Sequence, residues 1–154
     1  EIQRISESLS DIVWNINPKY DDLDQLFIRM KRYAADMLDG KNIRAELIFP
    51  DTTERLSMPM DQRRDFYLIF KEAVNNLVKY SEATKAIVKV TTDHHMIHLE
   101  VSDDGNGFEE GTMQYGNGME NMKQRAEKWK AMLVVRSAPT QGTSILLDMK
   151  VSQT

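Results

Sequence analysis

The chain has 154 residues, of which 41% are hydrophobic and 29% charged, and its formal net charge is −4. This balance is typical of one globular domain with a sizeable core, and the negative charge gives no overall attraction for nucleic acid. Cysteine is absent, which excludes disulfide bonds and thiolate metal sites. No apolar run reaches the roughly 20 residues of a membrane span, so we expect a water-soluble chain.

The first 40 residues predict two amphipathic helices. Apolar residues recur every three or four positions over residues 2–16, until a proline interrupts the pattern. A second stripe covers residues 23–37 and ends near Gly40, because glycine readily adopts the left-handed conformation of a helix C-cap. We expect residues 17–22 to form a hinge between these helices.

The middle of the chain alternates between strand and helix patterns. Residues 43–49 have a strand-like composition, and residues 54–58 are compatible with a short partner strand. Apolar residues at helical spacing then predict a third helix over residues 61–80. Residues 85–92 and 96–102 follow as two β runs, which we expect to pair across a short turn.

The last 40 residues continue the alternation. Residues 118–130 predict another helix, and residues 133–136 and 144–151 predict two strands joined by a turn with proline and glycine. No internal repeat or low-complexity segment is present. The order of elements predicts helices that cover one mixed sheet.

Three polar residues of the third helix fall at spacings of four and three, so Glu72, Asn76 and Lys79 project from one face. An asparagine carbonyl is a suitable Mg²⁺ ligand, a glutamate one turn earlier can orient a water or accept a proton, and a lysine attracts phosphate oxygens. The alternative is that the three residues form the solvated face of an ordinary amphipathic helix.

A turn at the end of the second β run carries Asp103, Gly105 and Gly107. A carboxylate there can accept a hydrogen bond from the exocyclic amine of adenine, and the glycines permit close approach of the backbone to a flat base. The alternative is an ordinary turn, since aspartate and glycine are common in turns. The pattern assigns no role to the neighbouring Asp104.

A second glycine pair, Gly116 and Gly118, precedes the helix predicted from residue 118. The free N–H groups at a helix N-terminus favour phosphate oxygens, although a loop followed by a helix start explains the pair equally well. The order and spacing of all three motifs together favour a nucleotide site.

The motif series then resembles the GHKL ATPases over residues 40–151: Glu72-x-x-x-Asn76-x-x-Lys79, Asp103-x-Gly105-x-Gly107, Gly116-x-Gly118 and Gln141-Gly142-Thr143. Residues 118–127 and 136–143 are similar to the catalytic domain of the nitrate-sensor-like branch of sensor histidine kinases. The resemblance implies an α/β two-layer sandwich of the Bergerat type, in which a mixed sheet is covered on one face by helices, with an N-terminal helical extension.

The resemblance also implies a role for each matching residue. Asn76 would bind Mg²⁺, Glu72 would assist a metal-bound water or the attacking imidazole, and Lys79 would contact phosphate. Asp103 would read the adenine of ATP, with Gly105 and Gly107 shaping its pocket. Gly116 and Gly118 would bound the ATP lid, and Thr143 would support the network near Asp103.

By this resemblance, residues 1–17 are the end of a dimerisation-hairpin helix and residues 18–154 the ATP-binding catalytic domain. The domain would transfer the ATP γ-phosphate to a histidine outside this chain, because His94, His95 and His98 fall at a predicted hairpin tip and on an outward strand position. Expected partners are the phosphoacceptor segment of the same protein, a response regulator and a second copy in the full-length homodimer. We expect a cytoplasmic domain, and whether the parent chain is anchored in the inner membrane stays open.

Two other functions remain open from the residues themselves. One is a regulatory nucleotide-binding module, either a serine/threonine kinase of the anti-sigma type or a non-catalytic switch. The other is a scaffold with an inactive site, in which the N-terminal helices mediate association.

Overall fold

The computed structural model describes residues 23–51, 56–109 and 118–153. The helix expected over residues 2–16, the hinge at residues 17–22 and Gly116 lie outside these ranges. The elements in chain order are α2 (Leu23–Asp39), β1 (Arg44–Ile48), β2 (Leu56–Ser57), α3 (Met60–Tyr80), β3 (Lys85–Asp93), β4 (Met96–Asp103), α4 (Gly118–Lys128), β5 (Met132–Ser137), β6 (Thr143–Lys150) and β7 (Ser152–Gln153).

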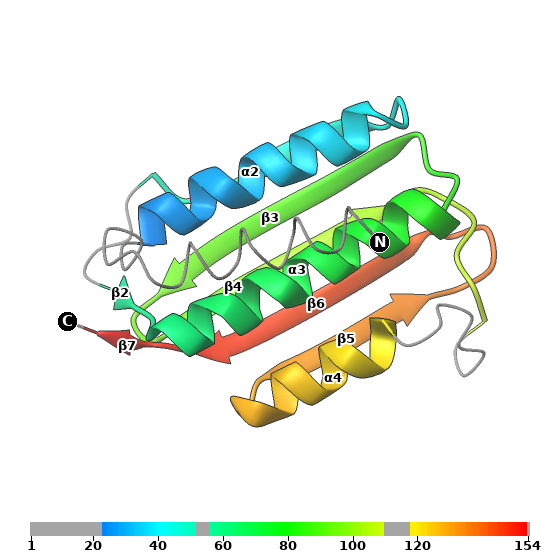
Figure 1. Ribbon diagram of the computed structural model, residues 1–154. Helices are drawn as coiled ribbons and strands as arrows, with labels where there is room; N and C mark the ends of the chain where they lie inside the picture. The colour runs from blue at the N-terminus through cyan, green and yellow to red at the C-terminus, as the bar shows by residue number, and fades with distance from the viewer. Residues whose placement is uncertain (1–22, 52–55, 110–117, 154) are drawn as a thin grey trace, which may run out of the picture.

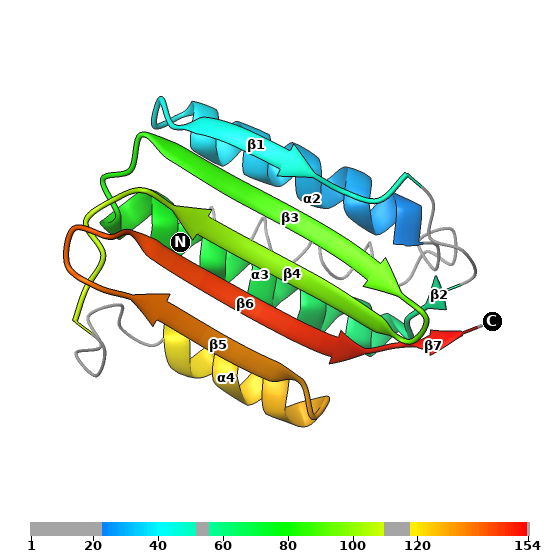
Figure 2. The same ribbon diagram turned by 180° about the vertical axis from the view of Figure 1, so that it is seen from behind.

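The five long strands form one sheet in the order β1-β3-β4-β6-β5. β1 runs parallel to β3, and every other neighbouring pair is antiparallel. α2, α3 and α4 all lie on one face of this sheet (Figure 1), and no helix of the described ranges covers the other face (Figure 2). The predicted α/β two-layer sandwich with a mixed sheet is therefore confirmed.

The short strand at residues 54–58 was expected beside residues 43–49, and that pairing is wrong. β2 pairs instead with β7, with Leu56 opposite Gln153. The parallel partner of β1 is β3, and the long β6 carries the chain end to β2. A nearby hydrogen bond from Gln62 Nε2 to the Lys150 carbonyl, at 2.8 Å, further ties the start of α3 to the end of β6.

The core lies between the sheet and the helices. Alternate residues of the central strands point inward, and α3 packs its apolar stripe on them. The buried residues at this contact include Phe66, Ile69, Phe70, Ala73, Val74 and Leu77 of α3, Ala86, Val88 and Val90 of β3, Ile97, Leu99 and Val101 of β4, and Ile145, Leu147 and Met149 of β6. Each large apolar side chain contributes roughly 1.5–3 kcal/mol when fully buried. This packing fixes the position of α3 over the middle of the sheet.

α3 also buries polar side chains, which its apolar stripe did not predict. It lies between α2 and α4 (Figure 1), so residues on its flanks are covered as well as those beneath it. The buried polar residues of α3 are Gln62, Arg63, Asp65, Lys71 and Asn76. None of the helices in the described ranges is long and apolar enough to cross a membrane.

α4 ends at Lys128, two residues earlier than predicted, and its end is fastened to α3. The carboxylate of Asp65 accepts hydrogen bonds from the Trp129 indole (2.7 Å) and from Arg125 (3.1 Å), and Lys128 Nζ lies 3.2 Å away. Burial alone would raise the pKa of Asp65, but these donors and positive charges together lower it. The carboxylate therefore stays ionised and clamps the end of α4.

Candidate functional site

Four segments that are distant in sequence meet at one end of the sheet. The Asn106 N–H, in the loop after β4, donates to the carbonyl of Ser81, the C-cap of α3, at 2.7 Å. The Thr140 N–H, in the β5–β6 turn, donates to the Asn106 carbonyl at 2.6 Å. Gly118, the first residue of α4, lies against Glu72 of α3. The loop after β4 and the β5–β6 turn therefore meet at the C-terminal end of α3, and the start of α4 lies against an earlier turn of the same helix. Gly116 lies outside the described ranges.

Asp103 is the last residue of β4 and lies directly opposite Thr143 on β6. Both continue the inward-facing series of their strands, so their side chains lie on the helix side of the sheet, the side that also carries Asn76. The Gly105 N–H donates to Asp103 Oδ1 at 2.8 Å, which is the local turn that the alternative interpretation requires. A local turn explains neither the pairing of Asp103 with Thr143 nor the partial burial of its carboxylate.

The environment of Asp103 disfavours its charge. Burial raises the pKa of this carboxyl, the Gly105 and Thr143 amides partly oppose the shift, and the nearby negative charge of Asp104 adds to it. A partly desolvated carboxylate gains most from a further hydrogen-bond donor. Asp103 is thus suited to receive a donor group from a ligand.

The glycines of the loop are required by the protein's own backbone. A Cβ at position 105 would collide with the Ser81 carbonyl, and one at Gly107, where φ is +64°, would collide with the Ala138 carbonyl. The absence of side chains here lets the loop pack against the C-cap of α3 and the β5–β6 turn. These glycines shape the site by letting the loop pack tightly between them.

Gly142 meets the same requirement from the other side. Its φ is +75°, and a Cβ there would collide with the Asp103 carbonyl. The residue stands in the Gln141-Gly142-Thr143 motif, but the sequence pattern assigned it no role of its own. It allows β6 to start close enough to β4 for Thr143 to lie opposite Asp103.

Asn76 is only 5% exposed, and its Nδ2 has no hydrogen-bond partner within the described part of the chain. A buried polar group left without a partner costs about 1–3 kcal/mol. The preceding Asn75 differs, because Tyr33 Oη of α2 donates to its Oδ1. The solvated-face interpretation is therefore wrong for Asn76, whereas Lys79 is exposed and Glu72 half-buried.

Glu72 lies at the N-terminus of α4. A Cβ at Gly118 would come within 2.5 Å of Glu72 Oε1, so any larger residue would displace the end of the Glu72 side chain. The first N–H groups of a helix have no partners within the helix, and its N-terminus carries partial positive charge. The geometry therefore joins the predicted catalytic helix to the start of α4.

Asp104 has a structural role that the sequence did not indicate. Its carboxylate accepts hydrogen bonds from the Thr84 N–H (2.8 Å), the Thr84 hydroxyl (2.7 Å) and the Lys85 N–H (3.0 Å). The Lys85 amide and the Thr84 hydroxyl are the main reasons that the pKa of Asp104 falls to about 2. Asp104 thus ties the end of β4 to the start of β3.

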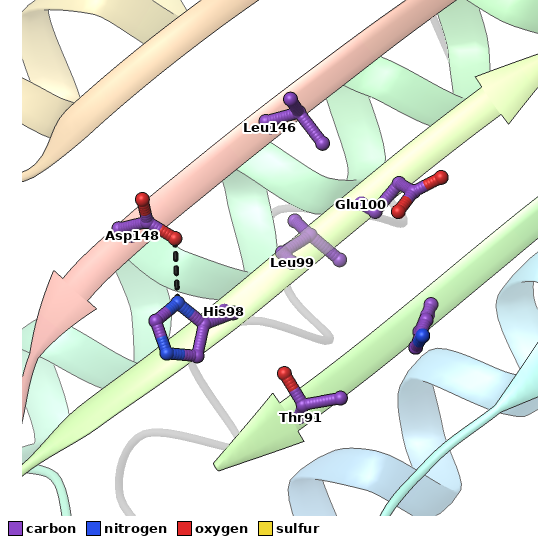
Figure 3. Close-up of a pocket in the computed structure, with 7 residues that line it drawn as sticks. Thr91, His98, Leu99, Glu100, Leu146 and Asp148 are labelled. Atoms are coloured by element: carbon purple, nitrogen blue, oxygen red, sulfur yellow. Dashed lines mark hydrogen bonds and ion pairs between the residues drawn. The ribbon is translucent and has the colours of Figure 1, made fainter. Parts of the chain in front are cut away.

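The histidines lie away from this site. His94 and His95 form the β3–β4 turn, and His98 points outward from β4 on the sheet face without helices, as predicted. There His98 Nδ1 contacts Asp148 and Nε2 lies 3.0 Å from Asp93, beside a shallow pocket of about 230 Å³ (Figure 3). Among the described residues no group of three or more histidines and carboxylates could hold a metal ion.

Comparison with known proteins agrees with this geometry. Residues 61–153 match the family of histidine kinase-, DNA gyrase B-, and HSP90-like ATPases. The chain is 29% identical over 98 residues to the sensor histidine kinase YxjM of Bacillus subtilis (strain 168) and 28% identical over 87 residues to the histidine-protein kinase/phosphatase DegS of Brevibacillus brevis. These matches cover 64% and 56% of this chain, and 24% and 22% of those relatives.

A solved structure shows the same fold. The blue-light activated histidine kinase EL346 of Erythrobacter litoralis superposes with a TM-score of 0.72 at 16% identity, over 99% of this chain and 50% of that one. The chain spans about a quarter of the length of the curated relatives, so their whole-protein activities do not transfer directly. The chain belongs to the family of histidine kinase-, DNA gyrase B- and HSP90-like ATPases and is an ATP-binding catalytic domain of the sensor histidine kinase type.

Proposed function

We propose that this chain supplies the ATP-binding half of a two-component signalling reaction, in a kinase of the nitrate-sensor-like branch. The γ-phosphate of ATP would pass to a histidine on a dimerisation segment outside this chain. The observation that carries the proposal is the buried side chain of Asn76, whose Nδ2 has no hydrogen-bond partner within the described part of the chain, on the same side of the sheet as the Asp103–Thr143 pair.

Asp103 and Thr143 would hold the adenine. An ionised Asp103 accepts a hydrogen bond from the exocyclic amine, and the Thr143 hydroxyl supports the same edge of the base. Gly105 and Gly107 hold the surrounding loop in place. Gly116 and Gly118 would bound the lid over the phosphates, with Gly118 at the N-terminus of α4, where N–H groups favour anions.

Asn76 fits a Mg²⁺ ion that accompanies ATP. A hard cation prefers oxygen ligands, and Asn76, which is buried and has no hydrogen-bond partner for its Nδ2 within the described part of the chain, would offer its Oδ1. When bound, the ion would neutralise part of the charge on the transferring phosphate.

Glu72 and Lys79 would act on either side of Asn76. Glu72, half-buried beside Gly118, is placed to hold a proton of a water or of the attacking imidazole. Lys79 is exposed on the last turn of α3, where a flexible ammonium group can reach phosphate oxygens. Phosphoryl transfer asks mainly for such positioning and charge neutralisation.

The proposal assigns residues 1–17 to the end of a dimerisation-hairpin helix and residues 18–154 to the catalytic domain. Its partners would be the phosphoacceptor segment of the same protein, a response regulator and a second copy in a homodimer. Because ATP and response regulators are found in the cytoplasm, we place the domain there.

The test compares two neighbouring asparagines. Asn76→Ala should strongly reduce Mg²⁺-dependent transfer of phosphate to a supplied histidine segment, while its circular dichroism spectrum stays that of the parent chain. Asn75→Ala is the matched control, because it removes the contact with Tyr33 of α2 and should weaken the fold more than the transfer reaction.

Near-normal phosphorylation of the histidine segment by the Asn76→Ala chain would refute the assignment. Transfer to a serine or threonine of a partner protein, with none to histidine, would instead favour the regulatory kinase of the anti-sigma type.

A further inference from the structure

α3 and α4 lie side by side and run in opposite directions (Figure 1). They are joined at two places: Gly118 at the start of α4 lies against Glu72, and Arg125 near its end donates to Asp65. Asp65 precedes Glu72 by seven residues, and Arg125 follows Gly118 by the same number. Both contacts therefore fit one antiparallel register, in which about 10 Å of helix separates them.

The apolar face of α4 does not define this register by itself. Its buried residues are Met119, Met122 and Ala126. Apolar burial has no preferred direction, and methionine side chains adapt to irregular gaps. Such a face holds α4 on the core but allows the helix to shift along its axis. The position of α4 along this axis therefore depends on directional polar contacts.

The carboxylate of Asp65 makes such contacts with three side chains at the end of α4. Its Oδ1 accepts from Arg125 Nη1 at 3.1 Å, and its Oδ2 accepts from the Trp129 indole at 2.7 Å and lies 3.2 Å from Lys128 Nζ. Only 6% of the Asp65 side chain is exposed, and hydrogen bonds to a carboxylate shielded from water are strong. A shift of α4 along its axis would disturb all three contacts at once.

The contact at the other end of α4 is the one that the reaction needs. The first N–H groups of α4 have no partners within the helix and would meet phosphate oxygens, while Glu72 would hold a proton of the attacking group. The distance between these groups depends on where α4 lies along α3. Misplacing a reacting group by about 1 Å can slow a reaction on the order of 10²-fold.

We propose that Asp65 is a positioning residue for phosphate transfer, which fixes α4 along its axis and thereby places the helix N-terminus at Gly118 against Glu72. The inference rests on the proposed function of Glu72 and of the start of α4. Asp65 lies about two helical turns from Glu72 and acts on the reaction through α4.

The test measures phosphate transfer from Mg-ATP to a supplied histidine segment, at a temperature at which circular dichroism shows every variant to be folded. Asp65→Ala should lower kcat at least about tenfold, because the start of α4 is then free to move by part of the 1 Å that costs 10²-fold. The dissociation constant for ATP should change much less, because the Asp103–Thr143 pair lies on β4 and β6. A purely structural role would change neither quantity in the folded protein.

The matched control is Gln62→Ala. Gln62 is also buried near the start of α3, but its Nε2 donates to the Lys150 carbonyl at 2.8 Å and so holds α3 to β6 rather than to α4. The substitution removes a buried hydrogen bond of α3 and should leave kcat at the parent value. An equal fall of kcat in Gln62→Ala and Asp65→Ala would trace the effect to a general loosening of α3 and overturn the inference.

A double variant tests whether Asp65 acts on the contact between Gly118 and Glu72. Gly118→Ala disturbs that contact directly. Adding Asp65→Ala should therefore lower kcat by clearly less than the product of the two single losses, because both changes act at one place. Losses that multiply would show that Asp65 does not act on this contact and would overturn the inference.

The remaining results separate the possible failures. A parent-like kcat in Asp65→Ala would overturn the inference. If that variant does not fold, Trp129→Phe serves instead, because it retains an aromatic ring and removes one donor to Asp65. Trp129→Phe should also lower kcat, and a parent-like value would overturn the inference equally. Failure of the parent chain to transfer phosphate to the histidine segment would refute the proposed function and, with it, this inference.

Discussion

Asp103→Asn separates the contribution of the carboxylate charge to ATP binding from its contribution to folding. The asparagine has nearly the same shape, and its Oδ1 can still accept the Gly105 N–H that Asp103 accepts at 2.8 Å. What the substitution removes is a partly desolvated negative charge. The pKa of Asp103 is raised mainly by burial, so the folded state disfavours the ionised form relative to the unfolded chain. At neutral pH this charge destabilises the fold, and the substitution should not lower the thermal midpoint of the nucleotide-free chain.

The loss in binding can be estimated from one hydrogen bond. The Gly105 and Thr143 amides already act on the carboxylate, so we count one further hydrogen bond from the purine amine, and a hydrogen bond to a charged group contributes about 1.5–3 kcal/mol. At 1.4 kcal/mol per tenfold, the dissociation constant for ATP should rise roughly 10- to 150-fold. In the parent chain, ATP affinity should also fall on acidification through a range above the usual aspartate pKa of about 3.9, whereas Asp103→Asn should show no such titration.

Calorimetric titration with Mg-ATP and a thermal melt without nucleotide test both statements. The control is Asp104→Asn, because Asp104 binds Thr84 and Lys85 and has a pKa of about 2. Its ionised form stabilises the fold, so this variant should melt lower and retain most of its ATP affinity. Unchanged ATP affinity in Asp103→Asn would remove Asp103 from the site, and a clear loss of thermal stability would contradict the burial argument.

Three further substitutions test the rest of the structure. Gly118→Ala places a Cβ 2.5 Å from Glu72 Oε1 and should slow phosphate transfer on the order of 10²-fold, since misplacing a catalytic group by about 1 Å has that effect. The control is Gly40→Ala, whose Cβ meets its nearest atom at 3.3 Å; it should leave the transfer rate unchanged. Asp65→Ala removes the acceptor of the Trp129 and Arg125 hydrogen bonds. In urea titrations it should lower the free energy of unfolding by about 1–3 kcal/mol. A change below about 0.5 kcal/mol, which is typical of surface positions, would show that the contact of Asp65 with the end of α4 does not stabilise the fold. The hydrogen bonds to Asp148 and Asp93 raise the pKa of His98. Protonated His98 should therefore stabilise the fold fully below about pH 6.5, and this stabilisation should be lost as the pH rises through the raised pKa. If the thermal midpoint of His98→Asn kept the pH dependence of the parent chain, His98 would not be the source of that dependence.

The polar face of α3 shows why the site was only partly predictable. Helical spacing placed Glu72, Asn76 and Lys79 on one face, because that geometry is local. The same spacing could not distinguish Asn75, whose Oδ1 accepts from Tyr33 of α2, from Asn76, which is buried and whose Nδ2 has no partner among the described residues. That difference depends on which helices flank α3, and the residues concerned are up to 42 positions apart.

The glycines and the last short strands make the same point about long-range packing. Turn propensity predicted a loop at residues 103–107, but the collisions that require glycine involve Ser81 and Ala138, which lie far away along the chain. β2 pairs with β7 rather than near β1, and Ser137 reaches Phe108 across the turn. None of these contacts can be predicted from a pattern of a few consecutive residues.

The alternation of apolar residues determined the long helices, the inward faces of the strands and the class of fold, because each periodicity reflects backbone geometry within a few residues. The order and spacing of the motifs predicted that residues 72–79, 103–107 and 141–143 belong to one nucleotide site, by resemblance to the GHKL ATPases. Only the tertiary structure decided which polar groups lose water, which glycines face another backbone and which hydroxyl contacts Thr143. Those properties arise from burial and from pairing between distant strands, and both exist only after the helices have packed on the sheet.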